Sequence, residues 1–183
     1  MKDRLLKGFQ RLRVFSGFAV SVIYLIFAEP KPALLAIGLV FAITGLIIRA
    51  WASGHIRKIN ELETSGPYSF TRNPLYFGTL LIIVGFAICS GKLWISVLAI
   101  AYFLFAYLPV IAAESNELKQ TFGESFIEYE KNVPELIPRL KPYRRNSERS
   151  FDFGLYLKNG EYNAAIGFFI AVVFLIVRIN GWI

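Results

Sequence analysis

Cysteine and histidine are almost missing from this chain. Its 183 residues contain one cysteine, Cys89, and one histidine, His55. A single cysteine cannot form an internal disulfide, and one histidine cannot build a multi-histidine metal cluster. We therefore expect neither a disulfide framework nor a metal centre, and we interpret His55 as an interfacial side chain rather than a general base.

Charged residues are also scarce. They make up 18% of the sequence, whereas 55% of it is hydrophobic, and soluble domains carry about 25% charge. Five runs of roughly 15 to 21 residues contain no charge, and a helix needs about 20 residues to cross the hydrocarbon. The sequence therefore predicts an all-α, polytopic integral membrane protein with about five transmembrane helices. The runs are Val14–Ala28, Pro32–Ile48, Asn73–Gly91, Leu93–Ala113 and Tyr162–Val177.

The basic residues are distributed unevenly. Seventeen of the 20 Lys and Arg precede the first run, separate the second from the third, or separate the fourth from the fifth. Because cytoplasmic loops carry an excess of Lys and Arg, we predict a multi-pass protein with a cytoplasmic N-terminus. We expect it in a bacterial or archaeal inner membrane. We therefore attribute the net charge of +7 mainly to the cytoplasmic loops of this topology. We expect membrane lipids, not nucleic acid, as partners. The basic run 139–149 is either a contact with phospholipid headgroups or a solvated cytoplasmic flank.

Glycines recur at matched spacing in the second and third runs. Gly38 and Gly45 are seven residues apart, as are Gly78 and Gly85. Small residues let membrane helices approach closely, so we expect each pair to face a neighbouring helix.

The stretch 65–78 combines turn formers, aromatic residues and a single cation. Gly66 and Pro67 favour a turn. Asn73 and Pro74 are typical of a helix start, with Asn as the cap and Pro in the first turn. Arg72 is therefore predicted to lie at the mouth of the third membrane helix.

A second polar segment begins at Glu114, shortly after Pro109, which we expect to bend the fourth helix. We predict a helix closed by Gly123 and a short second helix, 124–129. The third and fourth helices form a hairpin, so Arg72 and Glu114 should lie near each other. They form either a salt bridge that locks the hairpin or two walls of a polar pocket. The aromatic residues expected around such a pocket are Tyr68, Phe70, Tyr76 and Tyr129.

Two motifs in this region resemble those of the integral membrane methyltransferases, the isoprenylcysteine carboxyl methyltransferases and related phospholipid N-methyltransferases. The first is Gly66-x-Tyr68-x-x-x-Arg72-Asn-Pro-x-Tyr76-x-Gly78. The second is Glu114-x-x-x-Leu118-x-x-x-Phe122-Gly123, followed by Tyr129 and by Val133-Pro. The resemblance covers about residues 55–140. We accordingly divide the chain into an N-terminal segment with a membrane hairpin (1–54), a methyltransferase-like region (55–140), and a basic linker with a C-terminal membrane helix (141–183).

The resemblance implies S-adenosylmethionine as the cofactor, bound at the cytoplasmic face without a Rossmann domain. The sequence contains no glycine-rich dinucleotide fingerprint. Arg72 and Glu114 are the implied catalytic residues, with Glu114 facing the cofactor ammonium. By position, the implied cofactor-binding residues are Asn60, Leu62, Gly66, Tyr68, Arg72, Asn73, Pro74, Tyr76, Glu114 and Glu117.

The chain also departs from the family pattern. Asn73 stands where the family usually has His, and Asn60 where another His is frequent. Ser115 follows Glu114 in place of a second acidic residue. Val110 occupies the position of an Arg that is thought to hold the acceptor carboxylate in the prenylcysteine enzymes.

These departures leave the acceptor open: a phospholipid amine, a prenyl-thioether carboxylate or another lipophilic molecule. Two alternatives to a methyltransferase remain. One is an NADPH-dependent membrane reductase of the sterol or polyprenyl type, and the other is a non-enzymatic membrane adaptor.

Overall fold

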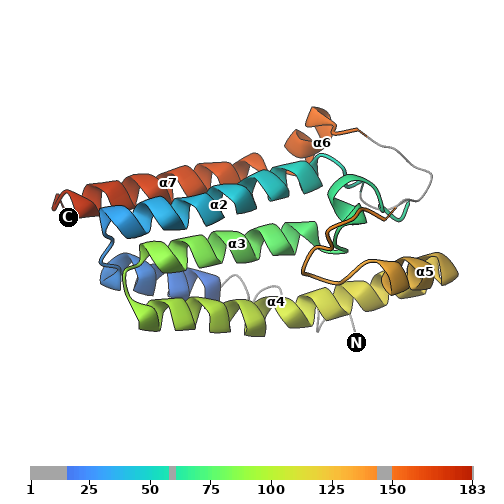
Figure 1. Ribbon diagram of the computed structural model, residues 1–183, viewed down its shortest axis with the longest axis horizontal. Helices are drawn as coiled ribbons and strands as arrows, with labels where there is room; N and C mark the ends of the chain where they lie inside the picture. Colours follow the sequence, from blue (N-terminus) through green and yellow to red (C-terminus); the bar gives the residue numbers. More distant parts are fainter. Residues whose placement is uncertain (1–15, 58–60, 144–149, 183) are drawn as a thin grey trace.

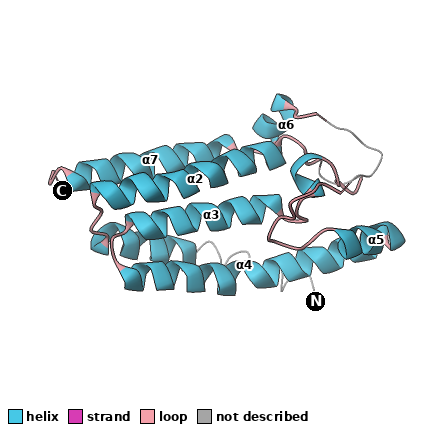
Figure 2. Cartoon of the chain, viewed as in Figure 1, coloured by secondary structure: helices cyan, strands magenta, loops and turns pink. Residues whose placement is uncertain are grey.

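The computed structural model describes residues 16–57, 61–143 and 150–182, and this part of the chain is helical and contains no strand (Figures 1 and 2). The all-α integral membrane architecture predicted from the sequence is confirmed. In chain order the elements are the helix Ser16–Phe27, then α2 (Pro32–Ser53), the 3₁₀ helix η1 (Gly66–Ser69), α3 (Pro74–Cys89), α4 (Leu93–Phe122), α5 (Glu124–Asn132), α6 (Phe153–Lys158) and α7 (Tyr162–Ile179).

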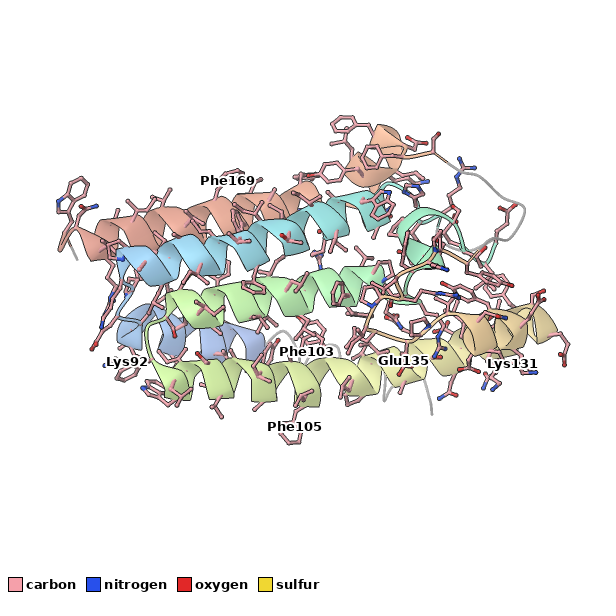
Figure 3. All side chains as sticks on the ribbon, in the orientation of Figure 1. Lys92, Phe103, Phe105, Lys131, Glu135 and Phe169 are labelled. Atoms are coloured by element: carbon pink, nitrogen blue, oxygen red, sulfur yellow. The ribbon has the colours of Figure 1, made fainter. Side chains whose placement is uncertain are left out.

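Three helices, α2, α4 and α7, are long and apolar enough to cross a membrane. The helix Ser16–Phe27 and α3 are apolar but shorter, so the count of five spans stays a prediction. Large apolar side chains project outward from the bundle, among them Phe105 of α4 and Phe169 of α7 (Figure 3). Exposed apolar side chains suit a surface in contact with lipid chains, because lipid chains are themselves apolar and contain no water.

Helices α2 and α3 pack through reciprocal glycine contacts. A Cβ placed on Gly38 would lie 2.3 Å from the carbonyl oxygen of Gly85, and one on Gly85 would lie 2.5 Å from that of Gly38. The pair Gly45 and Gly78 repeats this arrangement at 2.4 and 2.6 Å. The close approach predicted from the spacing of seven is confirmed, and we call this contact the glycine seam.

Polar contacts tie the chain together at the end of the bundle where α2 and α4 begin. Lys92 Nζ lies 2.7 Å from Glu29 Oε1, which joins the turn before α2 to the turn before α4. Arg178, near the end of α7, donates to the backbone oxygens of Leu25 and Ile26 at 2.7 and 2.8 Å. These contacts join the ends of four helices, which are Ser16–Phe27, α2, α4 and α7.

Inside the bundle, Arg49 of α2 joins three helices. Its Nε and Nη2 donate to the two carboxylate oxygens of Glu161, which precedes α7, at 2.6 and 2.9 Å. Its Nη1 donates to Thr79 Oγ1 of α3 at 2.6 Å. A charge at membrane depth is costly unless it is paired, and the bidentate geometry meets that requirement.

Helix α4 does not end where the apolar run ends. It passes through Pro109 and continues beyond Ala113 to Phe122, and Figure 1 shows a change of direction within α4. The polar residues of its last part include good helix formers such as Glu, Leu, Lys and Gln, so hydropathy marks the end of the apolar span but not the end of the helix. Gly123, at a φ of +53°, ends α4 as predicted and precedes α5.

Candidate functional site

A cavity of about 610 Å³ lies at the end of the bundle where α2 ends and α3 begins. Its walls come from the segment after α2, from η1 and the loop before α3, from the last part of α4, and from α5. The lining residues are Ile56, Arg57, Glu61, Leu62, Glu63, Tyr68, Arg72, Asn73, Glu114, Ser115, Glu117, Leu118, Thr121, Phe122, Phe126 and Tyr129.

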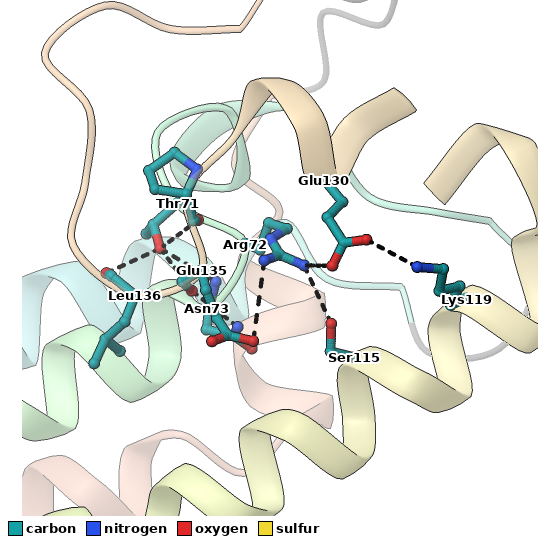
Figure 4. Close-up of polar contacts among 9 residues, drawn as sticks. Thr71, Arg72, Asn73, Ser115, Lys119, Glu130, Glu135 and Leu136 are labelled. Atoms are coloured by element: carbon teal, nitrogen blue, oxygen red, sulfur yellow. Dashed lines mark hydrogen bonds and ion pairs between the residues drawn. The ribbon is translucent and has the colours of Figure 1, made fainter. Parts of the chain in front are cut away.

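Arg72 is held from several sides at the wall of this cavity (Figure 4). Its Nη1 donates to Glu130 Oε1 at 2.9 Å and to Ser115 Oγ at 3.1 Å, and its Nη2 lies 4.0 Å from Glu135 Oε1. The guanidinium carbon lies 5.7 Å from the centre of the Phe126 ring. Arg72 thus fastens the loop before α3 to both α4 and α5.

Glu130 connects Arg72 to a second cation. Its Oε2 accepts a hydrogen bond from Lys119 Nζ of α4 at 3.3 Å (Figure 4). Burial opposes ionisation of this carboxyl, but the hydrogen bond from Lys119 and the positive charges of Arg72 and Lys119 outweigh it, so the pKa of Glu130 lies below its ordinary value. The carboxylate therefore stays ionised and keeps α5 against α4 at neutral pH.

Two buried donors in the cavity wall have no hydrogen-bond partner among the described residues. They are the Tyr68 hydroxyl and Arg72 Nε. A buried polar atom without a partner costs about 1–3 kcal/mol. Burial first, and then the neighbouring Tyr129 and carboxylates, raise the pKa of Tyr68, so the phenol stays protonated and can donate. Both residues line the cavity, but the two atoms themselves are almost fully shielded. A ligand that comes within hydrogen-bond distance of either atom would supply its missing acceptor.

Tyr129 of α5 supports Tyr68 from behind. Its hydroxyl donates to the Tyr68 backbone oxygen at 2.6 Å, and its ring belongs to a small buried cluster with Phe126 and Val133. Burial is the main reason that the pKa of Tyr129 is raised. The packing of α5 therefore fixes the position of η1 in the cavity wall.

Glu114 lies on the α4 wall, and Tyr76 of α3 donates to its Oε1 at 2.8 Å. Within the described residues, the ion pairs of Arg72 go to Glu130 and Glu135 rather than to Glu114. The alternative in which Arg72 and Glu114 form a salt bridge that locks the hairpin is therefore not what the structure contains. Both residues instead face one cavity.

Carboxylates outnumber cations in the lining. The acidic residues are Glu61, Glu63, Glu114 and Glu117, and the basic residues are Arg57 and Arg72. A cleft with an excess of one sign attracts ligands of the opposite sign. The carboxylates, the cysteine and the histidine of the described residues form no group of three that could hold a metal ion.

Several residues singled out in the sequence share this cavity. Of the predicted cofactor-binding residues, those in the lining are Leu62, Tyr68, Arg72, Asn73, Glu114 and Glu117. Asn60 lies outside the described residues. Asn73 stands at the start of α3 as predicted, but its side chain does not cap the helix and donates to the Glu135 backbone oxygen at 2.9 Å instead.

Three of the predicted residues do not line the cavity. Gly66, at a φ of +54°, lies against His55, and a Cβ there would come within 2.5 Å of the imidazole ring. Pro74 is buried in the first turn of α3. Tyr76 donates from its hydroxyl to Glu114 Oε1, at the edge of the lining. Their part in cofactor binding stays a prediction.

The sequence reasoning missed part of the wall, and a signal for it was present. The lining residues of α4 follow Glu114 at helical spacing, so one face of this helix forms the wall. The residues missed on that face are Ser115, Leu118, Thr121 and Phe122. Glu61 and Glu63 were passed over because the segment after α2 has no periodic pattern, so only the tertiary structure brings them to the cavity.

The chain is similar to known proteins along most of its length. A model of the phospholipid methyltransferase family matches residues 32–125. The cobalt-zinc-cadmium resistance protein CzcN of Cupriavidus metallidurans is 35% identical over 131 residues, which cover 70% of this chain and 60% of that protein. The nickel-cobalt-cadmium resistance protein NccN of Alcaligenes xylosoxydans xylosoxydans is 32% identical over 129 residues, 69% of this chain and 60% of that protein.

A eukaryotic relative is also similar. Protein-S-isoprenylcysteine O-methyltransferase B of Arabidopsis thaliana is 30% identical over 113 residues, which cover 57% of this chain and 56% of that protein. The chain thus matches about 60% or less of the length of these curated relatives. No solved structure matches it significantly.

Proposed function

Because the chain belongs to the phospholipid methyltransferase family, we propose that it transfers a methyl group from S-adenosylmethionine to a lipophilic acceptor. The donor would occupy the cavity of about 610 Å³. The observation that carries this proposal is the pair of unpartnered donors, the Tyr68 hydroxyl and Arg72 Nε, in the wall of that cavity. The uneven distribution of basic residues supports a cytoplasmic position for it.

The residues of the cavity suit this cofactor. S-adenosylmethionine supplies an electrophilic methyl group on a sulfonium, and it also carries an ammonium and a carboxylate. The carboxylates of Glu114 and Glu117 would hold positive groups, and the two unpartnered donors would hold oxygen acceptors. The rings of Phe126 and Tyr129 offer faces to a cation. An excess of carboxylates favours a ligand with net positive charge.

We propose that the protein binds and orients the cofactor and the acceptor, and that it excludes water from the reacting atoms. Arg72 and Glu114 would contact the cofactor, and their surroundings hold them in place: Glu130 and Ser115 fix Arg72, and Tyr76 fixes Glu114. Methyl transfer depends on alignment of the reacting atoms and on desolvation more than on an acid–base pair. Two rigid walls on either side of one cavity would provide this alignment and desolvation.

We further propose that the acceptor is lipophilic and reaches the site from the bilayer, as a phospholipid amine, a prenyl-thioether carboxylate or a similar group. Val110, at the position of the family's arginine, is buried in α4 and offers no charge. The excess of carboxylates in the lining also disfavours an anionic acceptor. These two features favour the amine over the carboxylate.

The cavity is less suited to the alternative of an NADPH-dependent reductase. NADPH carries several phosphate charges, and a site for it needs cations that are free to pair with them. Of the two arginines in the lining, Arg72 is already engaged by Glu130 and Glu135. Four glutamates share the same lining and would repel the phosphates.

Calorimetry on the full chain in detergent tests the proposal. We expect S-adenosylhomocysteine to bind with a micromolar dissociation constant and NADPH not to bind. Binding of NADPH alone would establish the reductase alternative. If neither molecule binds to folded protein, the cavity is no cofactor site and the adaptor alternative stands. Transfer of labelled methyl groups to an added lipid extract would then identify the acceptor.

A further inference from the structure

A second, smaller hollow of about 160 Å³ lies near the first cavity, and its wall is almost entirely apolar. Ile48 and Trp51 come from the last two turns of α2, Phe77 comes from the first turn of α3, and Phe70 comes from the loop between η1 and α3. Pro138, which follows α5, closes one side. No residue of this wall takes part in the larger cavity.

The segment 67–74 contributes to both spaces. Tyr68, Arg72 and Asn73 line the larger cavity, whereas Pro67, Phe70 and Pro74 belong to the hollow. The segment therefore forms a partition. A molecule in the hollow is in contact with the back of the loop that carries Arg72 and is separated from the larger cavity.

The position of the hollow along α2 decides what can enter it. Helix α2 is long and apolar enough to cross the membrane, and the hollow lies beside its last two turns. Trp51 is typical of the boundary between hydrocarbon and headgroups. The neighbouring Ile47 is 63% exposed on the outside of the bundle. What surrounds an apolar opening at this depth is the acyl chains of the bilayer.

The residues 134–143 form a strap that borders the hollow and carries cations. The backbone N–H groups of Arg139 and Tyr143 donate to Phe70 O and Ser69 O, each at 2.9 Å. Arg139 and Lys141 of the strap form no ion pair with any described residue. Arg139 Nη1 donates to the backbone oxygen of Asn132, which leaves its other N–H groups for a ligand. Its side chains Ile137 and Leu140 are 73% and 98% exposed, which suits contact with the membrane surface. The strap thus carries two cations within three residues of Pro138, which lines the apolar hollow.

We propose that the hollow binds an acyl chain of an anionic membrane phospholipid whose phosphate is held by Arg139 and Lys141. The apolar wall would contact the acyl chain, and the two cations would bind the negatively charged phosphate of the headgroup. This lipid is not the methyl acceptor, because the partition separates it from the larger cavity. It packs against the loop that carries Arg72 and supports it from behind. The proposal does not depend on methyl transfer or on a bound cofactor.

Fluorescence quenching by brominated lipids tests the site directly. The chain has three tryptophans, so the double variant Trp94→Phe/Trp182→Phe leaves Trp51 as a reporter inside the hollow. The double variant Trp51→Phe/Trp182→Phe leaves Trp94, at the opposite end of the bundle, as the reporter of bulk lipid. Each full-length protein is reconstituted in phosphatidylcholine vesicles with increasing fractions of phosphatidylglycerol or phosphatidylcholine that is brominated on its acyl chains.

We expect half-maximal quenching of Trp51 at a fraction of brominated phosphatidylglycerol about tenfold below that needed with brominated phosphatidylcholine, because each cation near the surface favours an anionic lipid. Trp94 should be quenched equally by both. The variant Arg139→Gln/Lys141→Gln should remove the tenfold preference at Trp51. Lys131→Gln/Lys158→Gln, which removes the same charge at two exposed positions outside both the strap and the lining of the hollow, should keep it.

The apolar part of the site has its own pair of variants in the Trp51 reporter protein. Ile48→Phe fills the hollow and should weaken quenching by both lipids severalfold, whereas Ile47→Phe adds the same ring to the outer face and should not. Equal quenching of Trp51 by both headgroups would overturn the proposal. So would a cation variant that behaves like its control, or an Ile48 variant that behaves like the Ile47 variant.

Discussion

The glycine seam joins α2 to α3, and the cavity lies beyond it, where α2 has ended and α3 has not yet begun. The two regions use space in opposite ways. In the seam, the backbones of α2 and α3 are so close that a Cβ on Gly45 would lie 2.4 Å from a carbonyl oxygen. In the cavity wall, two buried donors have no partner among the described residues, and about 610 Å³ is left open.

We infer that the seam contributes to the stability of the fold and that the cavity wall contributes to ligand binding. Contact between backbones gives α2 and α3 a fixed relative position, and small residues are what allows it. An unpartnered buried donor destabilises the ligand-free protein. It favours ligand binding, because the lost free energy is regained when a ligand supplies an acceptor. A rigid seam therefore holds a strained wall in place, and variants at the two levels should fail in different ways.

The largest effect is expected in the seam. Gly45→Ala forces a Cβ against the Gly78 carbonyl, so it should lower the free energy of unfolding by about 2–3 kcal/mol. Reversible unfolding in mixed detergent micelles measures this change. Gly167→Ala in α7 is the matched control, since nothing lies within 4 Å of a Cβ there, and it should change stability by at most about 1 kcal/mol. Equal effects of both variants would show that the seam is not tightly packed.

The next effect is expected at Glu114. Glu114→Ala should weaken binding of S-adenosylhomocysteine by about 10- to 100-fold, because a charged hydrogen bond is worth about 1.5–3 kcal/mol, while the protein stays folded. Calorimetry measures the dissociation constant. Glu124→Ala, which removes an exposed carboxylate from α5, should bind like the parent. Unchanged affinity of the Glu114 variant would remove this residue from the site.

Tyr68→Phe should weaken cofactor binding without lowering the stability of the protein. Because the Tyr68 hydroxyl is buried without a partner, its removal should leave the free energy of unfolding unchanged or raise it by about 1 kcal/mol, yet weaken cofactor binding by about tenfold. Tyr129→Phe is the counterpart. It removes a hydroxyl that has a partner, so it should lower stability by about 1 kcal/mol. A Tyr68 variant that is less stable than the parent would show that the hydroxyl has a structural role.

The smallest effect concerns pH. The pKa of Glu130 is lowered in the folded protein, so its contribution to stability is present above the ordinary glutamate pKa of about 4.3. It is lost as the pH falls through the lowered folded value. Acid titration of the unfolding free energy should therefore be less steep below about pH 4.3 in Glu130→Gln than in the parent. Identical acid profiles would mean that the Arg72–Glu130–Lys119 network does not stabilise the fold.

Much of the fold followed from local patterns. Charge-free runs predicted the apolar helices, and glycines at a spacing of seven predicted the seam. Prolines and glycines predicted the start of α3 at Asn73 and Pro74 and the end of α4 at Gly123. Helix α6 was not predicted, although Asp152 caps it with hydrogen bonds from the N–H groups of Gly154 and Leu155. Its six residues are too few for a periodic pattern to appear.

The site was harder to predict, because its parts come from distant segments. The motif residues Arg72 and Glu114 were expected to meet, and the structure places both in one lining. Their partners were not foreseen: Glu130 and Glu135 follow Phe122 at no regular spacing, and the side chain of Asn73 turns to Glu135 rather than to its own helix. Sequence spacing reports neighbours on one helix, but not which loop folds back across the helix ends.

The sequence by itself determined the membrane class, the apolar helices, the close approach of α2 to α3 and the family of the chain, because composition and local spacing carry these properties. Only the tertiary structure decided which charges pair with Arg72, which donors stay without a partner, and that the loop 67–74 separates a polar cavity from an apolar hollow. Those properties depend on long-range packing, where the side chains of one segment complete or leave open the hydrogen bonds of another.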